Sequence, residues 1–324
     1  MPEPLYDVVG LGNALVDVIT HEDDRFLDDH DLCKGSMALI DEARATALYA
    51  AMGVGTEMSG GSAANTVAGL ASFGGRAAFL GMVRDDELGR VFAHDLESNG
   101  VTFAASPATD GPSTGRCLIV VTPDAERTMS TFLGAGAAMG PEHIDLSVVG
   151  AAKVVYLEGY LFDSPEAKDA YRKASRIAHD AGGKVALTLS DSFCVQRHLD
   201  EWVALVDEQV DVLFGNADEL QVLCGPDFDQ AIRRIQGRVE VAVITRGAAG
   251  SVVVTADAVI EVPAEEVATL VDTTGAGDLF ASGFLYGYTR DLPLAECGRL
   301  GSLAAAEVIS HTGARPLQPL SRLA

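Results

Sequence analysis

Long apolar runs, patterned cysteines and basic stretches are all scarce in this sequence of 324 residues. No apolar run approaches the roughly 18 residues that a membrane-spanning helix needs. The N-terminal segment MPEPLYDVVG has no basic stretch followed by a long apolar one, which is what a secretory signal requires. We therefore expect a cytoplasmic protein that does not interact with a membrane.

Cysteine and histidine also lack the spacings that mark reactive or metal-binding sites. The five cysteines are scattered and none forms a CxxC pair, so the sequence predicts neither a disulfide framework nor a zinc site. The seven histidines show neither HxxxH nor HExxH spacing, and we expect each of them on the surface or in the core. The GxxxxGKS/T loop of P-loop enzymes and the GxSxG elbow of hydrolases are missing as well.

Positive charge is the scarcer sign, with 23 basic residues against 47 acidic ones and a net charge of −24. This balance disfavours nucleic acid and anionic membranes as partners, because both attract basic patches. A phosphate-bearing ligand would meet an adverse long-range field. It would therefore need local backbone amides, a metal cation or selected arginines.

Apolar residues make up 48% of the chain, which suffices for the core of a large α/β domain. One helical stretch covers 164–182, where Ser164 suits the N-cap, Pro165 suits the first helical position and a glycine pair ends the helix. Another, alanine-rich and amphipathic, covers about 294–310. Such stretches alternate with six β-type runs, which are 6–12, 77–83, 153–159, 184–190, 210–216 and 239–247. This rhythm predicts a parallel sheet with helices on both faces.

Two segments, about 13–41 and 101–132, break this rhythm. The first begins with a strand-like run, turns polar and returns through GSMALID. The second holds GRCLIVVTPDAERTMSTF, which has the pattern of a hairpin around Thr122-Pro123-Asp124. We expect short antiparallel strands from both segments to form a small sheet that covers a cleft, within a single domain of residues 1–324.

The stretch VVGLGNALVD invites a dinucleotide-binding interpretation, because Gly10-x-Gly12 follows a strand. Leu15 stands at the third glycine position, and the next residues favour a strand over a helix, so this fingerprint fails. Asn13 and Asp17 remain as polar residues near a strand end, where turn residues are common.

In SGGSAANTVAGL, Gly60-Gly61 precede a helix of small residues with Asn65 in its early turns. Small residues let the start of a helix come close to a ligand. They also suit a helix that packs closely on a sheet, and the sequence leaves both interpretations open.

Two further motifs follow predicted strands. In FGNADE, Asn216 and Glu219 have the spacing of a capping box, and the same pair could organise the water shell of a magnesium ion. In ITRGAAGSVV, Thr245, Gly247 and Gly250 predict a β-turn. Such a turn is compatible with nucleotide contact, because ligands of open α/β sheets lie beyond the carboxyl ends of the strands.

The stretch VDTTGAGDLFASGF, residues 271–284, carries the most specific pattern. Gly275 and Gly277 should bare backbone amides at the start of a helix, which is a site for phosphate or another anion. Asp278 follows in the first turn of that helix. A favourable charge at the helix N-terminus would contribute about 0.3–1 kcal/mol and explains an aspartate there. It does not explain the two glycines beside it.

Together these stretches resemble the ribokinase-like, PfkB-type kinases, and within that family the adenosine kinases. The resemblance covers nearly the whole chain and is most specific in GGSAANTVAGLASFGGRAAFLGMVRDDELG and DTTGAGDLFASGFL. It implies a three-layer α/β/α sandwich with a small antiparallel β lid. It also implies an ATP-dependent phosphotransferase that uses Mg²⁺.

The resemblance assigns roles to residues of this sequence. Asp278 becomes the base that takes the proton of the accepting hydroxyl, and the amides of Gly275, Ala276 and Gly277 form the anion hole for the γ-phosphoryl group. Asp17 would hold the sugar hydroxyls, with Asn13, Gly60, Gly61 and Asn65 beside it. Glu219, and Asn216 through water, match the NxxE motif that is tied to magnesium and phosphate. The resemblance places the remaining contacts to ATP at Asn216, Thr245, Gly247, Gly250, Thr274 and the lid residue Arg127.

The acceptor that the sequence favours is the 5′-hydroxyl of a purine nucleoside, with adenosine first. Four apolar residues could form a slot for the base, namely Leu15, Leu133, Tyr160 and Phe193. Met37 stands where adenosine kinases would place a polar substrate contact, so guanosine and inosine stay open. Two alternatives are a sugar kinase of the same fold, acting on ribose or fructose, and a non-catalytic ligand sensor. The sequence leaves open whether K⁺ assists the anion hole and whether the protein is a monomer or a homodimer.

Overall fold

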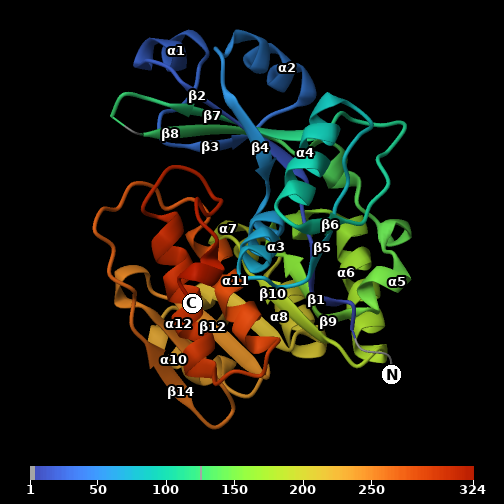
Figure 1. Ribbon diagram of the computed structural model, residues 1–324, viewed down its shortest axis with the longest axis vertical. Coiled ribbons are helices and arrows are strands. Elements are labelled where there is room, and N and C mark those ends of the chain that lie inside the picture. The colour runs from blue at the N-terminus through green and yellow to red at the C-terminus, as the bar shows by residue number, and fades with distance from the viewer. Residues whose placement is uncertain (1–3, 125) are drawn as a thin grey trace.

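The computed structural model describes residues 4–124 and 126–324, and Figure 1 shows its two sheets one above the other. The larger sheet has the strand order β14-β13-β12-β11-β10-β9-β1-β5-β6 within the described residues. Its neighbours from β6 to β12 are all parallel, whereas β13 and β14 pair antiparallel at one edge. The strands are β1 Tyr6–Leu11, β5 Ala77–Leu80, β6 Val101–Phe103, β9 Ala152–Glu158, β10 Lys184–Thr188, β11 Val212–Asn216, β12 Val241–Thr245, β13 Ser251–Val254 and β14 Val259–Val262.

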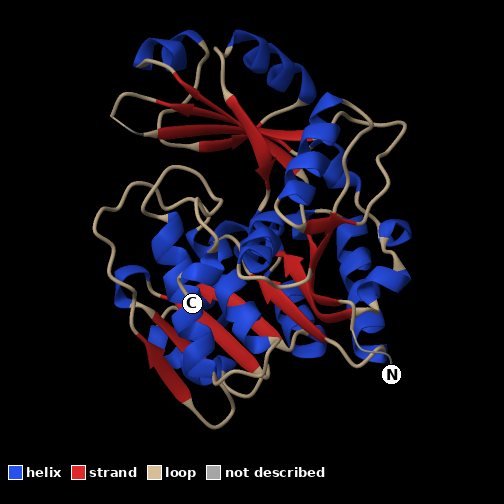
Figure 2. Cartoon of the chain, in the orientation of Figure 1, coloured by secondary structure: helices blue, strands red, loops and turns tan. Residues whose placement is uncertain are grey.

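Helices cover both faces of this sheet, as Figure 2 shows, and the apolar core is divided accordingly into two main clusters. Residues such as Val9, Val155 and Leu213 belong to one cluster, and sequence neighbours such as Val8 belong to the other. This alternation within continuous apolar strands is typical of a parallel sheet that is buried on both sides. The helices of the first cluster are α5 Leu146–Val149, α6 Pro165–Asp180, α7 Ser192–Arg197, α8 Leu199–Gln209, α9 Ala217–Cys224 and α10 Phe228–Ile235; those on the second side are α3 Ser62–Ser72, α4 Glu87–Ser98, α11 Ala276–Tyr288 and α12 Leu294–Val308.

The smaller sheet has the order β3-β8-β7-β2-β4 and forms a lid. Its outer face is covered by α1 Asp24–Asp29 and α2 Glu42–Ala51, and its other face is turned toward the rest of the molecule (Figure 1). The strands are β2 Leu15–His21, β3 Met37–Leu39, β4 Thr56–Gly60, β7 Gly115–Val121 and β8 Arg127–Phe132. No helix in the described parts of the chain is long and apolar enough to cross a membrane.

The lid differs from the sequence expectation in three respects. β4 lies outside both expected inserts, and Val101–Phe103 joins the main sheet as β6. The hairpin of β7 and β8 is antiparallel as expected, but β2 pairs with β7, and β3 with β8, in parallel. Parallel pairing is possible because the chain passes through the main body between β2 and β7, which provides the long crossover that parallel strands need.

Candidate active site

Polar side chains gather where the parallel strands of the main sheet end, under the lid. Asn13 follows β1, Glu158 ends β9, Asn216 ends β11 and Thr245 ends β12. The carboxyl ends of parallel strands share one edge of a sheet, and that edge is where open α/β folds bind ligands. Asp278 comes to the same edge at the start of α11, through its contacts to α3.

Asp278 is half-buried and is held by side chains from a distant segment. Its carboxylate accepts hydrogen bonds from Ser62 Oγ at 2.5 Å and from Asn65 Nδ2 at 2.9 Å. Burial raises the pKa of Asp278, while these two hydrogen bonds and the charge of Arg315 act in the opposite direction. The carboxylate is therefore both desolvated and fixed in orientation, as a group that accepts a proton needs to be.

The turn before Asp278 differs at its two glycines. Gly275 adopts a left-handed φ of 76°, and an added Cβ would lie 2.7 Å from Ala314 Cβ. Both the backbone conformation and this steric contact therefore disfavour a side chain at this position. At Gly277 an added Cβ would meet nothing within 4 Å. The amide of Ala276 donates to Thr273 O at 3.2 Å. Within the described residues, the amides of Gly275, Gly277 and Asp278 have no acceptor. The free donors therefore border an open space.

Asp17 faces the site from the lid strand β2, and its carboxylate receives no hydrogen bond from any described residue. Burial raises its pKa to about 6, against the opposing charges of Arg315 and Arg127. Gly60 packs directly on it, since an added Cβ would lie 2.4 Å from the Asp17 carboxylate. A carboxylate that is desolvated without a partner is suited to accept hydrogen bonds from ligand hydroxyls.

Asn13 and Asn65 also keep free acceptors. The Oδ1 atoms of both are buried without a hydrogen-bond partner among the described residues. Asn13 Nδ2 donates to Glu158 Oε1 at 2.7 Å, which fixes the orientation of the amide. Gly61 has a left-handed φ of 95°, and an added Cβ would lie 2.2 Å from Asn13 O. The unsatisfied oxygens mark this pocket as a place for a ligand that donates hydrogen bonds.

Arg127 of β8 connects the lid to the loop before α11. Its Nη2 atom lies 2.8 Å from Asp272 Oδ2, and its Nη1 atom donates to Thr274 Oγ1 at 3.0 Å. Both side chains of the ion pair are largely buried. The contact therefore holds a positively charged guanidinium next to the turn that precedes α11.

At the start of α9, Asn216 and Glu219 form the capping box that their spacing predicts. Asn216 Oδ1 accepts from the amide of Glu219, and Glu219 Oε2 accepts from the amide of Asn216, each at 2.9 Å. Burial raises the pKa of Glu219 to about 7. No cluster of three or more potential metal ligands occurs in residues 4–124 and 126–324.

The turn after β12 has the predicted form. Gly247 has a φ of 57° with open space beside it, whereas an added Cβ at Gly250 would lie 2.1 Å from Val262 O. Arg246 N donates to Gly250 O at 2.7 Å and closes the turn. Gly250 is thus required by the local backbone, while Gly247 and Thr245 border the sheet edge.

Comparison with known proteins decides the family. The profile of the pfkB family of carbohydrate kinases matches residues 46–320. The chain belongs to this family. An adenosine kinase from Sinorhizobium meliloti is 48% identical, with a TM-score of 0.91 and 98% of each chain covered. A protein from Rhizobium etli that is described as a probable sugar kinase is 46% identical, with a TM-score of 0.91, and the match covers 99% of this chain and 98% of that one.

A more distant relative is the adenosine kinase of Saccharomyces cerevisiae, which is 28% identical in a match that covers 94% of this chain and 95% of that protein. The family and these relatives confirm the predicted fold class and establish the chain as an ATP-dependent phosphotransferase. The ribokinase-like resemblance of the sequence is confirmed with them.

In this pfkB kinase the apolar residues expected around a base lie in separate places. The Leu15 side chain and the Leu133 backbone both lie beside Gly115, where an added Cβ would be 2.5 Å from Leu15 Cδ2 and from Leu133 O. Tyr160 and Phe193 are exposed by 41% and 69% and lie just after β9 and β10. The structure thus presents apolar side chains on the lid and on the main body.

Met37 is 52% exposed on β3, the strand at one edge of the lid. It pairs with Met129 of β8 and lies in a short strand whose three residues are all exposed. Met37 thus lies at an edge of the lid sheet, and its contact with a substrate stays a prediction.

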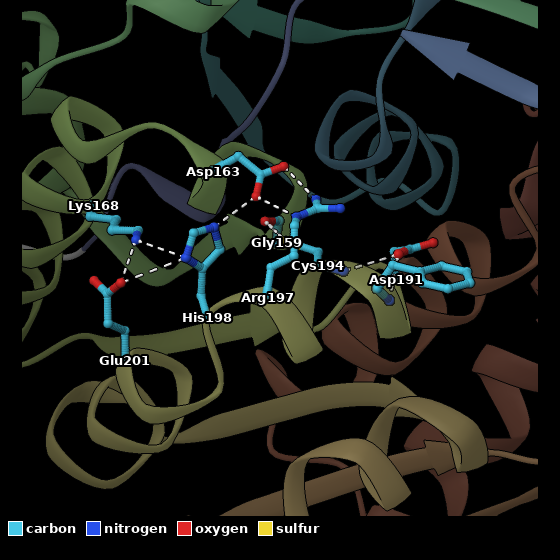
Figure 3. A network of polar contacts seen from close by, with 9 residues as sticks. Gly159, Asp163, Lys168, Asp191, Cys194, Arg197, His198 and Glu201 are labelled. Carbon is cyan, nitrogen blue, oxygen red and sulfur yellow. Dashed lines mark hydrogen bonds and ion pairs between the residues drawn. The ribbon is translucent and has the colours of Figure 1, made fainter.

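A polar network joins the two segments that carry Tyr160 and Phe193 (Figure 3). Asp163, at the end of the 3₁₀ helix Gly159–Asp163, accepts from Arg197 Nη2 at 2.6 Å and contacts His198 Nε2 at 2.9 Å. Arg197 and His198 end α7, whose first turn holds Phe193. The network therefore fixes the two aromatic segments relative to each other.

Sequence reasoning missed three residues that the structure places in the site. Ser62 binds Asp278, Glu158 binds Asn13 and the amide of Ala63, and the charge of Arg315 acts on Asp278. Burial raises the pKa of Glu158 to about 7. One signal was present, because a glutamate at the end of the apolar run KVVYLEG needs a partner when it is buried. Ser62 and Arg315 carried no comparable local signal.

Proposed function

We propose that this kinase transfers the γ-phosphoryl group of ATP to the 5′-hydroxyl of a purine nucleoside, with adenosine as the preferred acceptor. The observation that carries the proposal is the arrangement around Asp278. This carboxylate is held by Ser62 and Asn65 and stands beside an open space at Gly277 and backbone amides that have no acceptor among the described residues. Its charge also acts on Asp17, which receives no hydrogen bond from any described residue.

Each group then has a role that its surroundings support. Asp17, with the free oxygens of Asn13 and Asn65, would accept hydrogen bonds from the sugar hydroxyls. The amides of Gly275 and Gly277 would donate to the charge that develops on the transferring phosphoryl group. Asp278 would accept the proton of the attacking hydroxyl. Phosphoryl transfer depends mainly on such positioning and charge stabilisation.

Cations would complete the nucleotide side. Magnesium would be held through water by Glu219 and would neutralise charge on the phosphates. Arg127 would reach the phosphates when the lid closes, because it already lies beside Thr274 in the anion-hole turn. Closure of the lid would exclude water, which competes as an acceptor. The residues that would border the nucleotide at the same sheet edge are Asn216, Thr245, Gly247, Gly250 and Thr274.

The choice of a nucleoside rests on the exposed rings of Tyr160 and Phe193, which follow strands β9 and β10 on the carboxyl side of the main sheet. Burial, followed by the charge of Asp278, raises the pKa of Tyr160, so its hydroxyl lies within the electrostatic influence of the proposed base. Aromatic faces stack on nucleobases, whereas a small sugar has no comparable surface to offer. The relative from Sinorhizobium meliloti, described as an adenosine kinase, supports this choice.

A sugar kinase is the second candidate. The Rhizobium etli relative described as a probable sugar kinase favours it, and Asp17 would hold the hydroxyls of a free sugar equally well.

Purified protein with ATP and Mg²⁺ should be assayed against adenosine, inosine, guanosine, ribose and fructose. We expect adenosine to be turned over fastest, with equal amounts of AMP and ADP formed. Turnover of ribose or fructose with no nucleoside activity would establish the second candidate instead.

A further inference from the structure

Arg315, in the loop after α12, joins segments that are far apart in the chain. Its Nη1 atom donates to Ala64 O at 2.7 Å, and its Nη2 atom donates to Ser59 O at 3.0 Å and to Ser59 Oγ at 2.8 Å. Ser59 lies in the lid strand β4 next to its last residue, Gly60, and Ala64 lies in the first turn of α3. One planar guanidinium thus fixes the junction between the lid strand β4 and the helix α3.

The groups that Arg315 holds are the direct neighbours of the residues at the site. Ala64 stands between Ser62 and Asn65, the two residues that bind Asp278. A shift of this helical turn would therefore move both hydrogen-bond donors of Asp278 together.

The positive charge of Arg315 lies among negatively charged carboxylates. The negative charges of Asp95, Asp17 and Asp278 all act on its guanidinium. Asp95 also accepts a hydrogen bond from the amide of Ser59 at 2.9 Å, so it lies against the same strand end. Neighbouring carboxylates repel one another, and a half-buried positive charge among them favours their ionised forms.

Other titratable groups face the two aspartates from neighbouring elements. Arg127 of β8 is the second cation that acts on Asp17. Glu158 and Tyr156 of β9, together with Tyr160 just after that strand, feel the charge of Asp278. None of these three can supply a positive charge to Asp278, which leaves Arg315 as the cation that acts on it among the described residues.

We propose that Arg315 is a positioning residue for Asp278. Arg315 holds the first turn of α3 in place against the lid strand β4, and it supplies the positive charge that offsets the carboxylates of the site. This inference rests on the proposed function, because it takes Asp278 to be the base. Arg315 itself needs no contact with the reacting atoms.

The test compares R315Q with R315K in the full-length protein, using the pH profile of kcat/KM with ATP and adenosine. R315Q loses the charge, so the pKa of the base should rise and the acid limb should move up by about one pH unit, a tenfold loss on that limb. R315K keeps the charge but loses the planar fork, so its acid limb should stay near the wild-type limb while kcat falls.

R299Q serves as the control, since Arg299 is an exposed arginine of α12 paired with Glu296. Its profile should match the wild type. A shift in R299Q equal to that in R315Q would show a general effect of net charge and overturn the inference.

Chemical rescue separates the charge from the fold. R315A should regain activity and the wild-type acid limb when guanidinium is added, but not with the same millimolar concentration of urea, which is similar in shape and neutral. An unmoved acid limb in R315Q, or equal rescue by urea, overturns the inference. Failure of the proposed function would look different, because the wild type itself would then show no turnover of adenosine, or D278N would keep the activity of the wild type.

Discussion

Two helices, α9 and α11, start at the same edge of the main sheet, and each has a carboxylate as its third residue. In α9 the acid serves its own helix. Glu219 accepts from the amide of Asn216 at 2.9 Å and from its side chain at 2.8 Å. In α11 no side chain caps the helix, and Asp278 instead binds Ser62 and Asn65, which lie 216 and 213 residues earlier.

This difference shows the role of Gly275 and Gly277 at the start of α11. A capping side chain satisfies the first amides of a helix and removes them from other uses. At α11 the cap is Gly275, so amides stay free and the acid is available to a partner outside the helix. A first-turn carboxylate therefore supports chemistry when the local capping function is absent.

Substitution of Asp278 should lower activity more than any other change, and it tests the contrast between the acids of α9 and α11 most directly. We expect D278N to lower kcat by about 10²–10⁴-fold, the range for loss of a general base. ATP affinity, measured by calorimetry, should change little, because the free amides of Gly275 and Gly277 belong to the backbone and do not depend on the Asp278 side chain. Activity of D278N within a few-fold of the wild type would contradict the assignment of the base.

Substitution of Gly275 and Gly277, the two glycines at the start of α11, should separate activity from stability. G277A places a methyl group in open space, so the protein should fold normally while kcat falls about tenfold, because the methyl occupies the proposed phosphoryl site. G275A should instead lose about 1–3 kcal/mol of unfolding free energy, since its backbone is left-handed and Ala314 lies against it. Steady-state kinetics and thermal unfolding of both variants test this contrast. A wild-type kcat for G277A would count against the anion hole.

Substitution of Glu219 asks whether the acid of α9 serves only its own helix. A glutamine side chain can still accept from the amide of Asn216, so the capping box should survive in E219Q. Loss of the charge should raise the Mg²⁺ concentration for half-maximal activity about tenfold. D218N is the matched control, because Asp218 is an exposed acid in the same helical turn. An equal effect of both variants would remove the special role of Glu219.

Asp17 adds a third case to the comparison, a carboxylate that caps no helix and has no hydrogen-bond partner in residues 4–124 and 126–324. Its substitution should give the smallest effect. Its folded pKa of about 6 lies above the ordinary value of 3.8, so the ionised form destabilises the fold. This penalty is fully present above about pH 6 and disappears as the pH falls below the ordinary value. D17N should therefore be more stable than the wild type at pH 8, on the order of 1 kcal/mol, and nearly equal to it at about pH 3. Denaturant unfolding at the two pH values measures this, and equal stability at pH 8 would refute the penalty.

Local patterns predicted the main sheet well. The run 153–159 became β9, and the helix expected over 164–182 became α6 with Ser164 as its N-cap. These features depend on apolar spacing and capping residues within a few positions. The lid was predicted less well, because alternating side chains look the same in parallel and antiparallel strands.

The sequence by itself determined the alternation of strands and helices, the capping box of α9 and the bare glycine turn before Asp278, since each depends on residues only a few positions apart. The tertiary structure decided which side chains meet that aspartate. Ser62, Asn65 and Arg315 reach it or its supporting turn from distant parts of the chain, and packing of α3 against α11 brings them together. No local pattern encodes such contacts, because their geometry exists only after the helices pack on the sheet.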